Sequence, residues 1–303
     1  TTIELAIYQA FRFDFDLGRA ALLSLAQLVL TFAAALLALK TSGAEGFGAG
    51  LDRPVQRWDA SSTLLRVQDG ALIVLAALFL LLPLLAIVLD GVPGLSVLPW
   101  SVFRAAGYSI LVALGSTCVL LALAVPMAAS IATGRAGPVE LAGLLGLAVS
   151  PLVIGTGLFL IVNPVADPFA LALPVTALVN AAMALPFALR ILVPAAREIV
   201  VVQGRLALSL DMRGWPFVRR VLLPRLRPQI GFAAGLAAAL SMGDLGVIAL
   251  FADPNRATLP LQIYRLMGAY QMEAAAGAAL LLLILSVALF WSLDRGGRWH
   301  AEA

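Results

Sequence analysis

Seven long apolar stretches, separated by shorter polar connections, divide the sequence. Each is long enough to form a membrane-spanning helix, because a hydrocarbon core of about 30 Å needs roughly 20 apolar residues in helical form. The pattern therefore predicts an all-α fold, a polytopic membrane bundle of about seven spans. The predicted spans are residues 20–39, 71–89, 105–133, 139–162, 169–193, 230–251 and 274–293.

Prolines within four of these windows predict that some spans are kinked or broken. A proline removes one backbone hydrogen bond and crowds the preceding turn, but neighbouring helices in a membrane bundle re-satisfy the freed carbonyl groups. The residues concerned are Pro126, Pro151, Pro174 and Pro186.

Arginine and lysine residues collect on alternate connections, which predicts the orientation of the chain. Connections 40–70, 134–138 and 194–229, with the tail 294–303, carry 14 of these residues, whereas the opposite set carries five. Short loops rich in lysine and arginine stay in the cytoplasm. We therefore expect a multi-pass protein of a bacterial inner membrane, with the amino terminus of this chain outside and the carboxyl terminus in the cytoplasm.

Composition supports a membrane protein and argues against several other classes. Of the 303 residues, 62% are hydrophobic and 12% are charged, which is more apolar than a soluble fold of this size requires. The net charge of +3 comes from arginines beside apolar spans, so membrane orientation explains it without nucleic-acid binding. Cys118 is the only cysteine and His300 the only histidine, so neither a disulfide framework nor a metal cluster is expected.

Two segments about 256 residues apart resemble each other. Residues 5–25 and 261–281 each contain an Ile-Tyr pair, then an acidic residue, then small residues leading into an apolar helix. Both enter the membrane from the outside by the charge count, so they predict a parallel repeat; alternatively, membrane helices look alike through composition alone. The repeat, with a chain that begins without methionine, predicts the end of a first lobe at 1–39, a cytoplasmic linker at 40–70 and a second lobe at 71–303.

The longest cytoplasmic connection, residues 194–229, carries seven arginines. Its spacing predicts a short helix from Arg205 to Met212 that ends near Gly214 and Pro216. Held beneath the bundle, such a helix would offer apolar side chains to a groove on a cytoplasmic partner. The alternative is a helix on the lipid surface, anchored by arginines that reach anionic headgroups.

The same connection resembles the cytoplasmic coupling loop of ATP-binding-cassette (ABC) importer permeases. That family's pattern is Glu-Ala-Ala, three residues, Gly, nine residues, Ile, one residue and Leu-Pro. Here Ala207 matches the second alanine and Val221 stands in the isoleucine position, while Leu223 and Pro224 match the Leu-Pro.

Three positions of the loop depart from that pattern. Arg205, Leu206 and Asp211 replace the glutamate, the first alanine and the glycine. The resemblance implies that the loop couples the permease to its cassette. The residues to which it gives this role are Arg205, Leu206, Ala207, Ser209, Leu210, Asp211, Arg213, Gly214, Trp215, Leu223 and Pro224.

Within this family, three segments resemble the thiamine and thiamine-diphosphate permeases. They are residues 205–215, 243–247 and 258–260, and residues 7–21 resemble the end of that permease's first lobe. The resemblance implies that this subunit forms the path for thiamine or its phosphate esters. A cytoplasmic ATP-binding cassette dimer would bind ATP and magnesium, and an extracytoplasmic substrate-binding protein would deliver the substrate. Iron(III)-importing permeases with two fused lobes are the nearest alternative.

The chain shows no nucleotide site of its own. A phosphate-binding loop needs a glycine-rich stretch before its lysine, and Lys40, the only lysine, lacks it. We therefore expect neither ATPase activity nor a cofactor in this chain. An ATP-independent secondary transporter is the alternative class, for which Asp244 is the obvious acidic candidate to carry a coupling ion. A membrane scaffold without a transport role is a third.

Polar residues inside the predicted spans are the candidates for a translocation path. A charge near a helix centre costs at least about 2.5 to 3.5 kcal/mol, so Asp244 needs a partner or water. As a hypothesis, it faces the path and helps to recognise a cationic ring, with Gly243 and Gly246 letting the backbone approach. The alternative is a structural pair with Arg190 or a hydrogen-bonded kink. Asn180 is a second candidate, which either lines the path or joins two helices.

Overall fold

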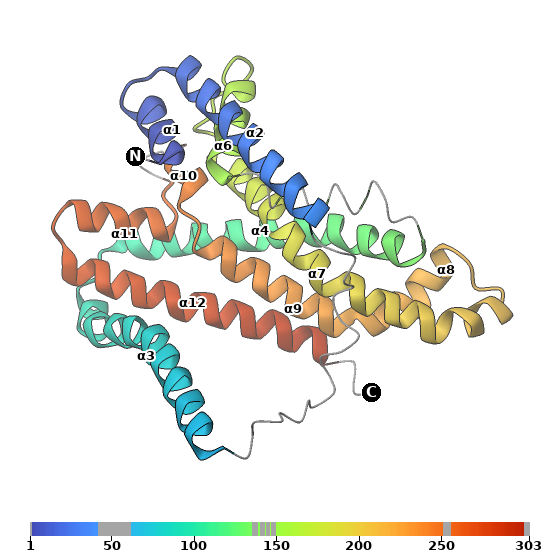
Figure 1. The fold of residues 1–303 in the computed structure, drawn as a ribbon. Helices are drawn as coiled ribbons and strands as arrows, with labels where there is room; N and C mark the ends of the chain where they lie inside the picture. Colours follow the sequence, from blue (N-terminus) through green and yellow to red (C-terminus); the bar gives the residue numbers. More distant parts are fainter. Residues whose placement is uncertain are drawn as a thin grey trace. The chain divides into compact units, whose positions relative to one another are not determined.

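The structure is a computed structural model that describes residues 2–41, 62–134, 150–250 and 256–299, together with 139, 143 and 146. Within these residues every regular element is helical (Figure 1), as the apolar pattern predicted. Six segments among them are long and apolar enough to cross a bilayer: Leu17–Ala34, Thr63–Val97, Trp100–Ala132, Ala172–Ser209, Trp215–Leu250 and Met272–Arg298.

The helices follow one another along the chain with short connections. They are α1 (Ile3–Arg12), α2 (Leu17–Thr41), α3 (Thr63–Gly94), the 3₁₀ turn η1 (Leu95–Val97), α4 (Trp100–Ala132), α6 (Pro151–Val162), α7 (Ala172–Ser209), α8 (Trp215–Phe217), the π-helical turn η2 (Val218–Leu222), α9 (Leu223–Met242), α10 (Gly246–Leu250), α11 (Leu259–Gly268) and α12 (Met272–Arg298). The predicted span 139–162 is represented mainly by α6, and most of its first half lies outside the described residues.

Several boundaries differ from those that the sequence predicted. Helix α3 begins at Thr63, so the described end of the predicted linker is already helical, while residues 42–61 lie outside the described part. Pro151 opens α6 instead of kinking a span, because the first helical turn needs no donor from the proline nitrogen. Pro126 and Pro186 lie inside α4 and α7, each of which is assigned as one helix throughout.

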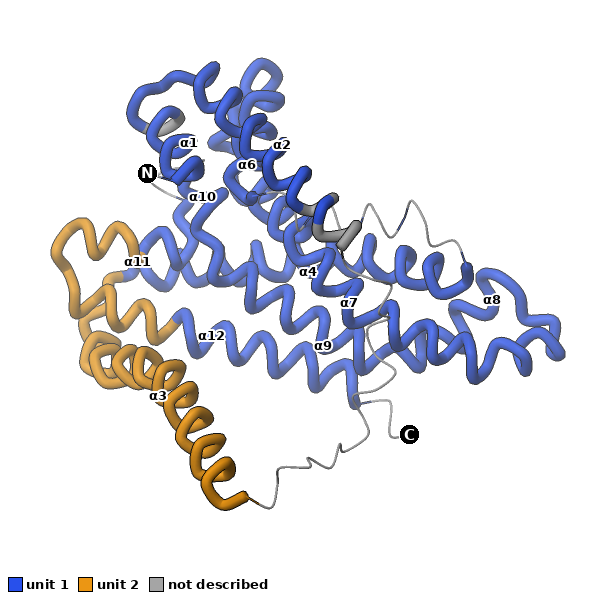
Figure 2. Tube along the Cα trace, viewed as in Figure 1, with its two compact units in different colours: residues 1–43, 100–262, 282–303 blue, residues 44–99, 263–281 orange. Residues whose placement is uncertain are grey.

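The chain divides into two compact units (Figure 2). One unit contains α3, η1, the end of α11 and the first part of α12. In this unit α3 approaches α12 closely at glycines: a Cβ added at Gly91 would lie 2.6 Å from the Cβ of Leu280, and one added at Gly94 would overlap the backbone of Gly277. Most of the remaining surface of α3 is apolar and exposed, which is typical of a helix that faces lipid.

The second unit contains α1, α2, the helices from α4 to α10, the first residues of α11 and the end of α12. Its core is formed where α4, α7 and α9 pack together through small and branched side chains such as Leu120, Ala184, Leu192 and Ala237. The end of α12 packs against α9 at Gly235, where an added Cβ would lie 2.7 Å from the Phe290 carbonyl oxygen. Small residues allow such close approach between membrane helices.

The two segments that resemble each other in sequence also have similar local structures. Helices α1 and α11 are both 10 residues long, and each is followed by a short turn and a long apolar helix, α2 or α12. Each turn contains one non-glycine residue in the left-handed region, Phe15 with φ of 53° and Tyr270 with φ of 58°. A left-handed residue with a side chain is uncommon. Both turns contain one, at positions that differ by one residue from the 256-residue spacing of the two segments.

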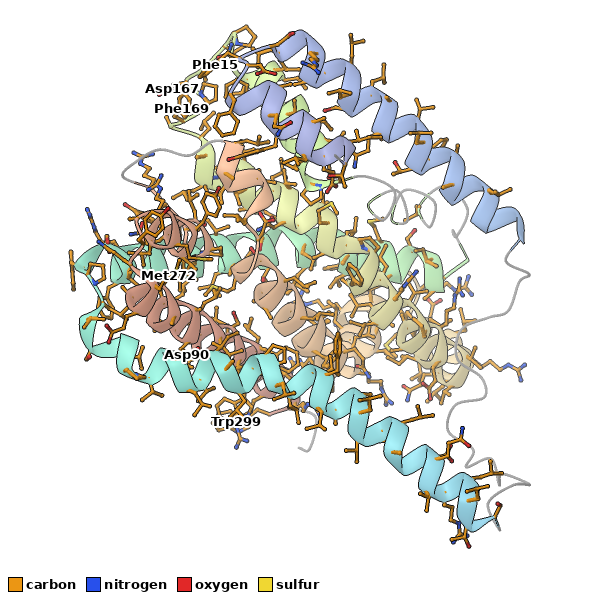
Figure 3. The ribbon with its side chains drawn as sticks, turned by 60° about the vertical axis from the view of Figure 1, so that its left-hand side comes forward. Phe15, Asp90, Asp167, Phe169, Met272 and Trp299 are labelled. Carbon is orange, nitrogen blue, oxygen red and sulfur yellow. The ribbon has the colours of Figure 1, made fainter. Side chains whose placement is uncertain are left out.

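The charge count placed connections 1–19 and 163–168 on the same side of the membrane, and in the structure they lie at the same end of their unit. Figure 3 shows Phe15, in the turn between α1 and α2, at the same end as Asp167 and Phe169, which precede α7. Helix α2 also packs against α6. The alternation of sides inferred from arginine and lysine is therefore consistent with the fold of this unit.

Candidate functional sites

The basic connection after the membrane-spanning part of α7 forms a helical hairpin, here called the coupling hairpin and comprising residues 194–229. Helix α7 has 38 residues and is therefore roughly 57 Å long, about twice the thickness of a hydrocarbon core. It continues beyond the predicted end of its span at 193 as far as Ser209. The prediction of a separate short helix at Arg205–Met212 is wrong, because Arg205–Ser209 form the last residues of α7.

Packing explains why the helix continues so far. Ala196 and Ala207 of α7 are buried against Phe217, Leu222 and Leu226, which follow the turn of the hairpin. Fully burying one leucine contributes about 1.5 to 3 kcal/mol, whereas a glycine inside a helix, such as the one at position 204, costs about 1 kcal/mol. The apolar contacts across the hairpin therefore outweigh the local helix-breaking signal.

Helix α7 ends in a Schellman motif, in which a left-handed residue closes the last turn. The Met212 N–H donates to the Ala207 carbonyl oxygen at 2.8 Å, and the Asp211 N–H donates to the Leu208 carbonyl oxygen at 3.1 Å. Asp211 has φ of 53°. The residue that replaces the family's glycine thus occupies the position where glycine is preferred, and aspartate is one of the few other residues that tolerate it.

The hairpin then reverses through Gly214, whose φ of 62° and ψ of −128° suit a residue without a side chain. Helix α8 and the π-helical turn η2 follow, and α9 begins at Leu223 with Pro224 in its first turn. Both Leu223 and Pro224 are half-buried. The Leu-Pro of the family pattern therefore marks the start of the membrane-spanning helix α9, where proline fits.

The tip of the hairpin exposes a group of apolar side chains. Leu206, Leu208, Leu210 and Trp215 are each between 55% and 67% exposed, whereas Ala207 between them is buried. The exposed residues around the tip are Arg205, Ser209, Asp211, Arg213, Arg219 and Arg220. Such a tip fits either an apolar groove with an acidic rim on a partner protein or a membrane surface.

The polar groups around the tip have mainly local roles. The Ser209 hydroxyl donates to the Leu206 carbonyl oxygen at 2.7 Å. The Arg213 guanidinium lies 3.5 Å from the Asp211 carboxylate, and both side chains are at least 75% exposed. An ion pair that is this exposed contributes little to stability. The arginines of the tip are consequently available to an external partner.

The second candidate site is a break in the membrane span that follows the hairpin. Helix α9 ends at Met242 and α10 begins at Gly246, so residues 243–245 are non-helical. The Asp244 Oδ1 atom accepts a hydrogen bond from the Gly246 N–H at 3.2 Å, and the Asp244 N–H donates to the Ser241 carbonyl oxygen at 3.4 Å. We call this segment the polar break.

These contacts give Asp244 a structural role. They are those of a hydrogen-bonded break, because Asp244 joins the end of one helix to the start of the next. The two glycines do not serve close backbone packing, since a Cβ at either Gly243 or Gly246 would make only ordinary contacts of 3.6 Å or more.

Asn180 fastens the same segment from a neighbouring helix. Its Nδ2 atom on α7 donates to the Ser241 hydroxyl oxygen at 2.8 Å, and it lies 3.5 Å from the Ser241 carbonyl oxygen. Both side chains are buried. Asn180 thus joins two helices, which is one of the two interpretations of the sequence. Its partner Ser241 also accepts the Asp244 N–H through its carbonyl oxygen.

Sequence reasoning missed three hydroxyl residues of this region: Ser241, Ser150 and Thr156. Serine and threonine are ordinary inside membrane helices, so no local pattern singles them out. Ser241 lies 61 residues from its partner Asn180, which means that only the tertiary structure brings the pair together.

The fold defines the general class of the protein. The described residues are helical in their regular parts, and six of their segments are apolar and long enough to cross a bilayer, with a helical hairpin and a broken span as distinctive features. The chain is a polytopic helical membrane protein.

Comparison with curated proteins narrows this class. The chain is 38% identical over 319 residues to the thiamine transport system permease protein ThiP of Salmonella typhimurium, covering 100% of this chain and 58% of that protein. The corresponding Escherichia coli protein is 37% identical, with 97% of this chain and 57% of that protein covered. A sulfate transport system permease protein of Synechocystis is 31% identical over 38% of this chain and 43% of its own length. No protein-family model matches the chain.

The chain is thus a homologue of the thiamine transport system permease proteins, which confirms the resemblance inferred from its motifs. It spans a little more than half the length of the curated relatives that it matches.

Proposed function

We propose that this chain is part of the permease of an ABC importer and moves thiamine or thiamine phosphates into the cytoplasm by alternating access. The observation that carries the proposal is similarity along the whole chain, at 35% to 38% identity, to permeases named for thiamine transport. The exposed apolar tip of the coupling hairpin supports it, because an importer permease must offer its cassette a docking surface.

In this proposal the hairpin lies in the cytoplasm and its tip binds the cassette. The orientation follows from the concentration of arginines in this connection. Leu206, Leu210 and Trp215 would enter a groove on the cassette, with the surrounding arginines facing acidic groups at its rim. Energy then comes from ATP and magnesium bound by a cassette dimer, and this chain contributes no ATPase site.

Helix α7 provides a direct mechanical link from the tip to the membrane interior. Leu206 and Asn180 lie on this same helix, 26 residues or roughly 39 Å apart. The buried cluster at the base of the hairpin also ties α7 to the start of α9. A cassette that binds the tip differently in its open and closed states would therefore move both helices that hold the polar break.

The remaining partners complete the transporter. An extracytoplasmic substrate-binding protein would deliver thiamine, and a further permease lobe, equivalent to this one and preceding α1, would form the other side of the path. The similar turns of α1–α2 and α11–α12 support this first lobe, because each pair of helices would form the end of one lobe. Lipid would cover α3 and the other exposed apolar faces.

Two other functions are the competing outcomes. An iron(III) importer would share the architecture, and an ATP-independent transporter would share the membrane helices. Thiamine is favoured over iron because the relatives that match along the whole chain are named for thiamine transport. The hairpin favours an ATP-driven system, because its exposed apolar tip is suited to docking in a groove of a cassette.

The test is transport by the complete permease, containing this chain, reconstituted in liposomes with its cassette and binding protein. We expect ATP-dependent uptake of labelled thiamine that excess unlabelled thiamine blocks and ferric ion does not. Uptake without ATP, or uptake of iron in place of thiamine, would refute the proposal.

The docking role of the tip is tested by substituting Leu206, Leu210 and Trp215 together with alanine. These side chains are exposed, so we expect unchanged thermal stability but at least tenfold less transport per ATP hydrolysed. The matched control replaces Val201 and Val202, which lie on α7 before the tip and are more exposed than the three substituted residues, and it should transport normally. Normal coupling in the triple variant would exclude the tip from cassette binding.

A further inference from the structure

Asp244 has one carboxylate oxygen that its structural role does not use. Its Oδ1 atom accepts the Gly246 N–H and so closes the polar break. Its Oδ2 atom is buried and has no hydrogen-bond partner among the described residues. A carboxylate oxygen left without a partner inside a membrane protein is costly, and polar side chains in that position usually serve substrates or ions.

Other unused polar atoms come from the helix next to the break. The hydroxyl oxygens of Ser150 and Thr156 are also buried without a partner in the described part of the chain, and Thr156 is only 1% exposed. Gly246 lies between Asp244 and the start of α6. A Cβ added at Gly246 would lie 3.6 Å from Asp244 Oδ1 and 3.7 Å from the Cβ of Pro151, the residue after Ser150. The start of α6 and the Asp244 carboxylate therefore flank the same glycine.

The surroundings of the break determine which ligand charge it suits. The helices on either side, α6, α7 and α10, contribute apolar residues such as Phe159, Val179 and Val247 to one cluster. An anion would be repelled by the carboxylate, and a neutral apolar molecule would leave Oδ2 unsatisfied. A cation with an apolar body satisfies both the carboxylate and the apolar walls.

We propose that the Asp244 Oδ2 atom, near the start of α6, contacts the positively charged ring of the substrate as it crosses the membrane. The inference rests on the proposed function, since the thiazolium ring of thiamine carries a permanent positive charge. It gives Asp244 two roles, one for each oxygen: Oδ1 holds the break, and Oδ2 selects for a cation.

The position of the break in the fold agrees with a site on the path. Helices α6 and α10 are the elements that α1 and α2 contact, and Ala10 and Ala20 of the latter pair belong to the same apolar cluster. The repeat assigns α1 and α2 to the end of a preceding lobe. The polar break therefore adjoins the surface between two lobes, where alternating access opens and closes a path.

The first measurement compares Asp244→Asn with wild type in the complete reconstituted transporter. Asparagine keeps an oxygen for the Gly246 N–H but loses the charge, so the break should be preserved. We expect at least a tenfold increase in KM for thiamine with normal assembly with the cassette. The control is Asp167→Asn, because Asp167 Oδ1 accepts the Phe169 N–H at 3.0 Å in an equivalent but exposed turn. An unchanged KM in Asp244→Asn would overturn the proposal.

The second measurement does not depend on transport. Cysteine is introduced by Ser150→Cys after Cys118, the only cysteine of this chain, and any cysteine elsewhere in the complete permease are replaced by alanine. We expect a cationic methanethiosulfonate to label this cysteine at least tenfold faster than an anionic one, thiamine to protect it, and Asp244→Asn to abolish the charge preference. Equal rates for the two reagents, or absence of labelling, would overturn the proposal.

The two measurements separate this inference from the proposed function. If wild type does not transport thiamine, the function fails, while the charge preference at Ser150→Cys still tests the cation site. If wild type transports thiamine and neither measurement responds to Asp244→Asn, only the cation site is refuted.

Discussion

Substitutions of Asp211 test the closure of the coupling hairpin most directly. The left-handed conformation costs a residue with a side chain about 1 to 2 kcal/mol, and aspartate less than most. Asp211→Gly removes this cost. Glycine also makes the unfolded chain more flexible, which destabilises the folded state by about 0.5 to 1 kcal/mol. The ion pair with Arg213 that is lost is exposed and contributes little. We therefore expect the hairpin of this variant to be within about 1 kcal/mol of wild type.

Asp211→Val is the contrasting substitution. A β-branched side chain at φ of 53° is strained, and holding it there costs about 1 to 3 kcal/mol. The Schellman hydrogen bonds should then open more often. Because about 1.4 kcal/mol corresponds to a factor of ten, we expect exchange of the Met212 amide hydrogen to accelerate by about ten- to a hundredfold.

The assay is hydrogen exchange followed by mass spectrometry on peptides that cover the hairpin, with transport per ATP measured in parallel. Arg213→Ala is the control, since it removes the same ion pair without changing the backbone, and its exchange should match wild type. If Asp211→Val exchanges as slowly as Asp211→Gly, the left-handed residue is not what closes α7. The explanation that the family's glycine is needed for a left-handed conformation at this position would then be refuted.

The sequence was informative wherever one short segment determines the outcome. Runs of about 20 apolar residues predicted the spans, because a bilayer imposes that length on any helix. The likeness between residues 5–25 and 261–281 was visible for a similar reason, because each is a continuous segment whose turn and helix are set locally. The end of α7 was not predictable in this way, because Leu222 and Leu226, which stabilise it, follow the turn that they help to fold.

The candidate sites show the same division. The position of Asp211 follows from the glycine of the family pattern, since that position demands a left-handed residue. The cap made by Asp244 is also local, spanning two residues. In contrast, the clamp between Asn180 and Ser241 and the unused hydroxyl of Ser150 depend on how helices pack, which no spacing in the sequence reveals.

Two further predictions concern helix packing and are measured by thermal unfolding in detergent. Asn180→Ala should destabilise the protein by about 1 to 2 kcal/mol, and a double-mutant cycle with Ser241→Ala should give a coupling energy of about 0.6 to 1.7 kcal/mol; additive effects would mean that the 2.8 Å contact contributes nothing. Gly297→Ala should destabilise by about 1 to 3 kcal/mol, because its Cβ would lie 2.6 Å from the Arg227 carbonyl oxygen, a backbone atom that cannot move aside alone. The neighbouring Gly296→Ala meets no atom within 4 Å and should be neutral or slightly stabilising, since alanine favours the helix. Equal stability of these two variants would show that α12 does not approach α9 as closely as the structure places it.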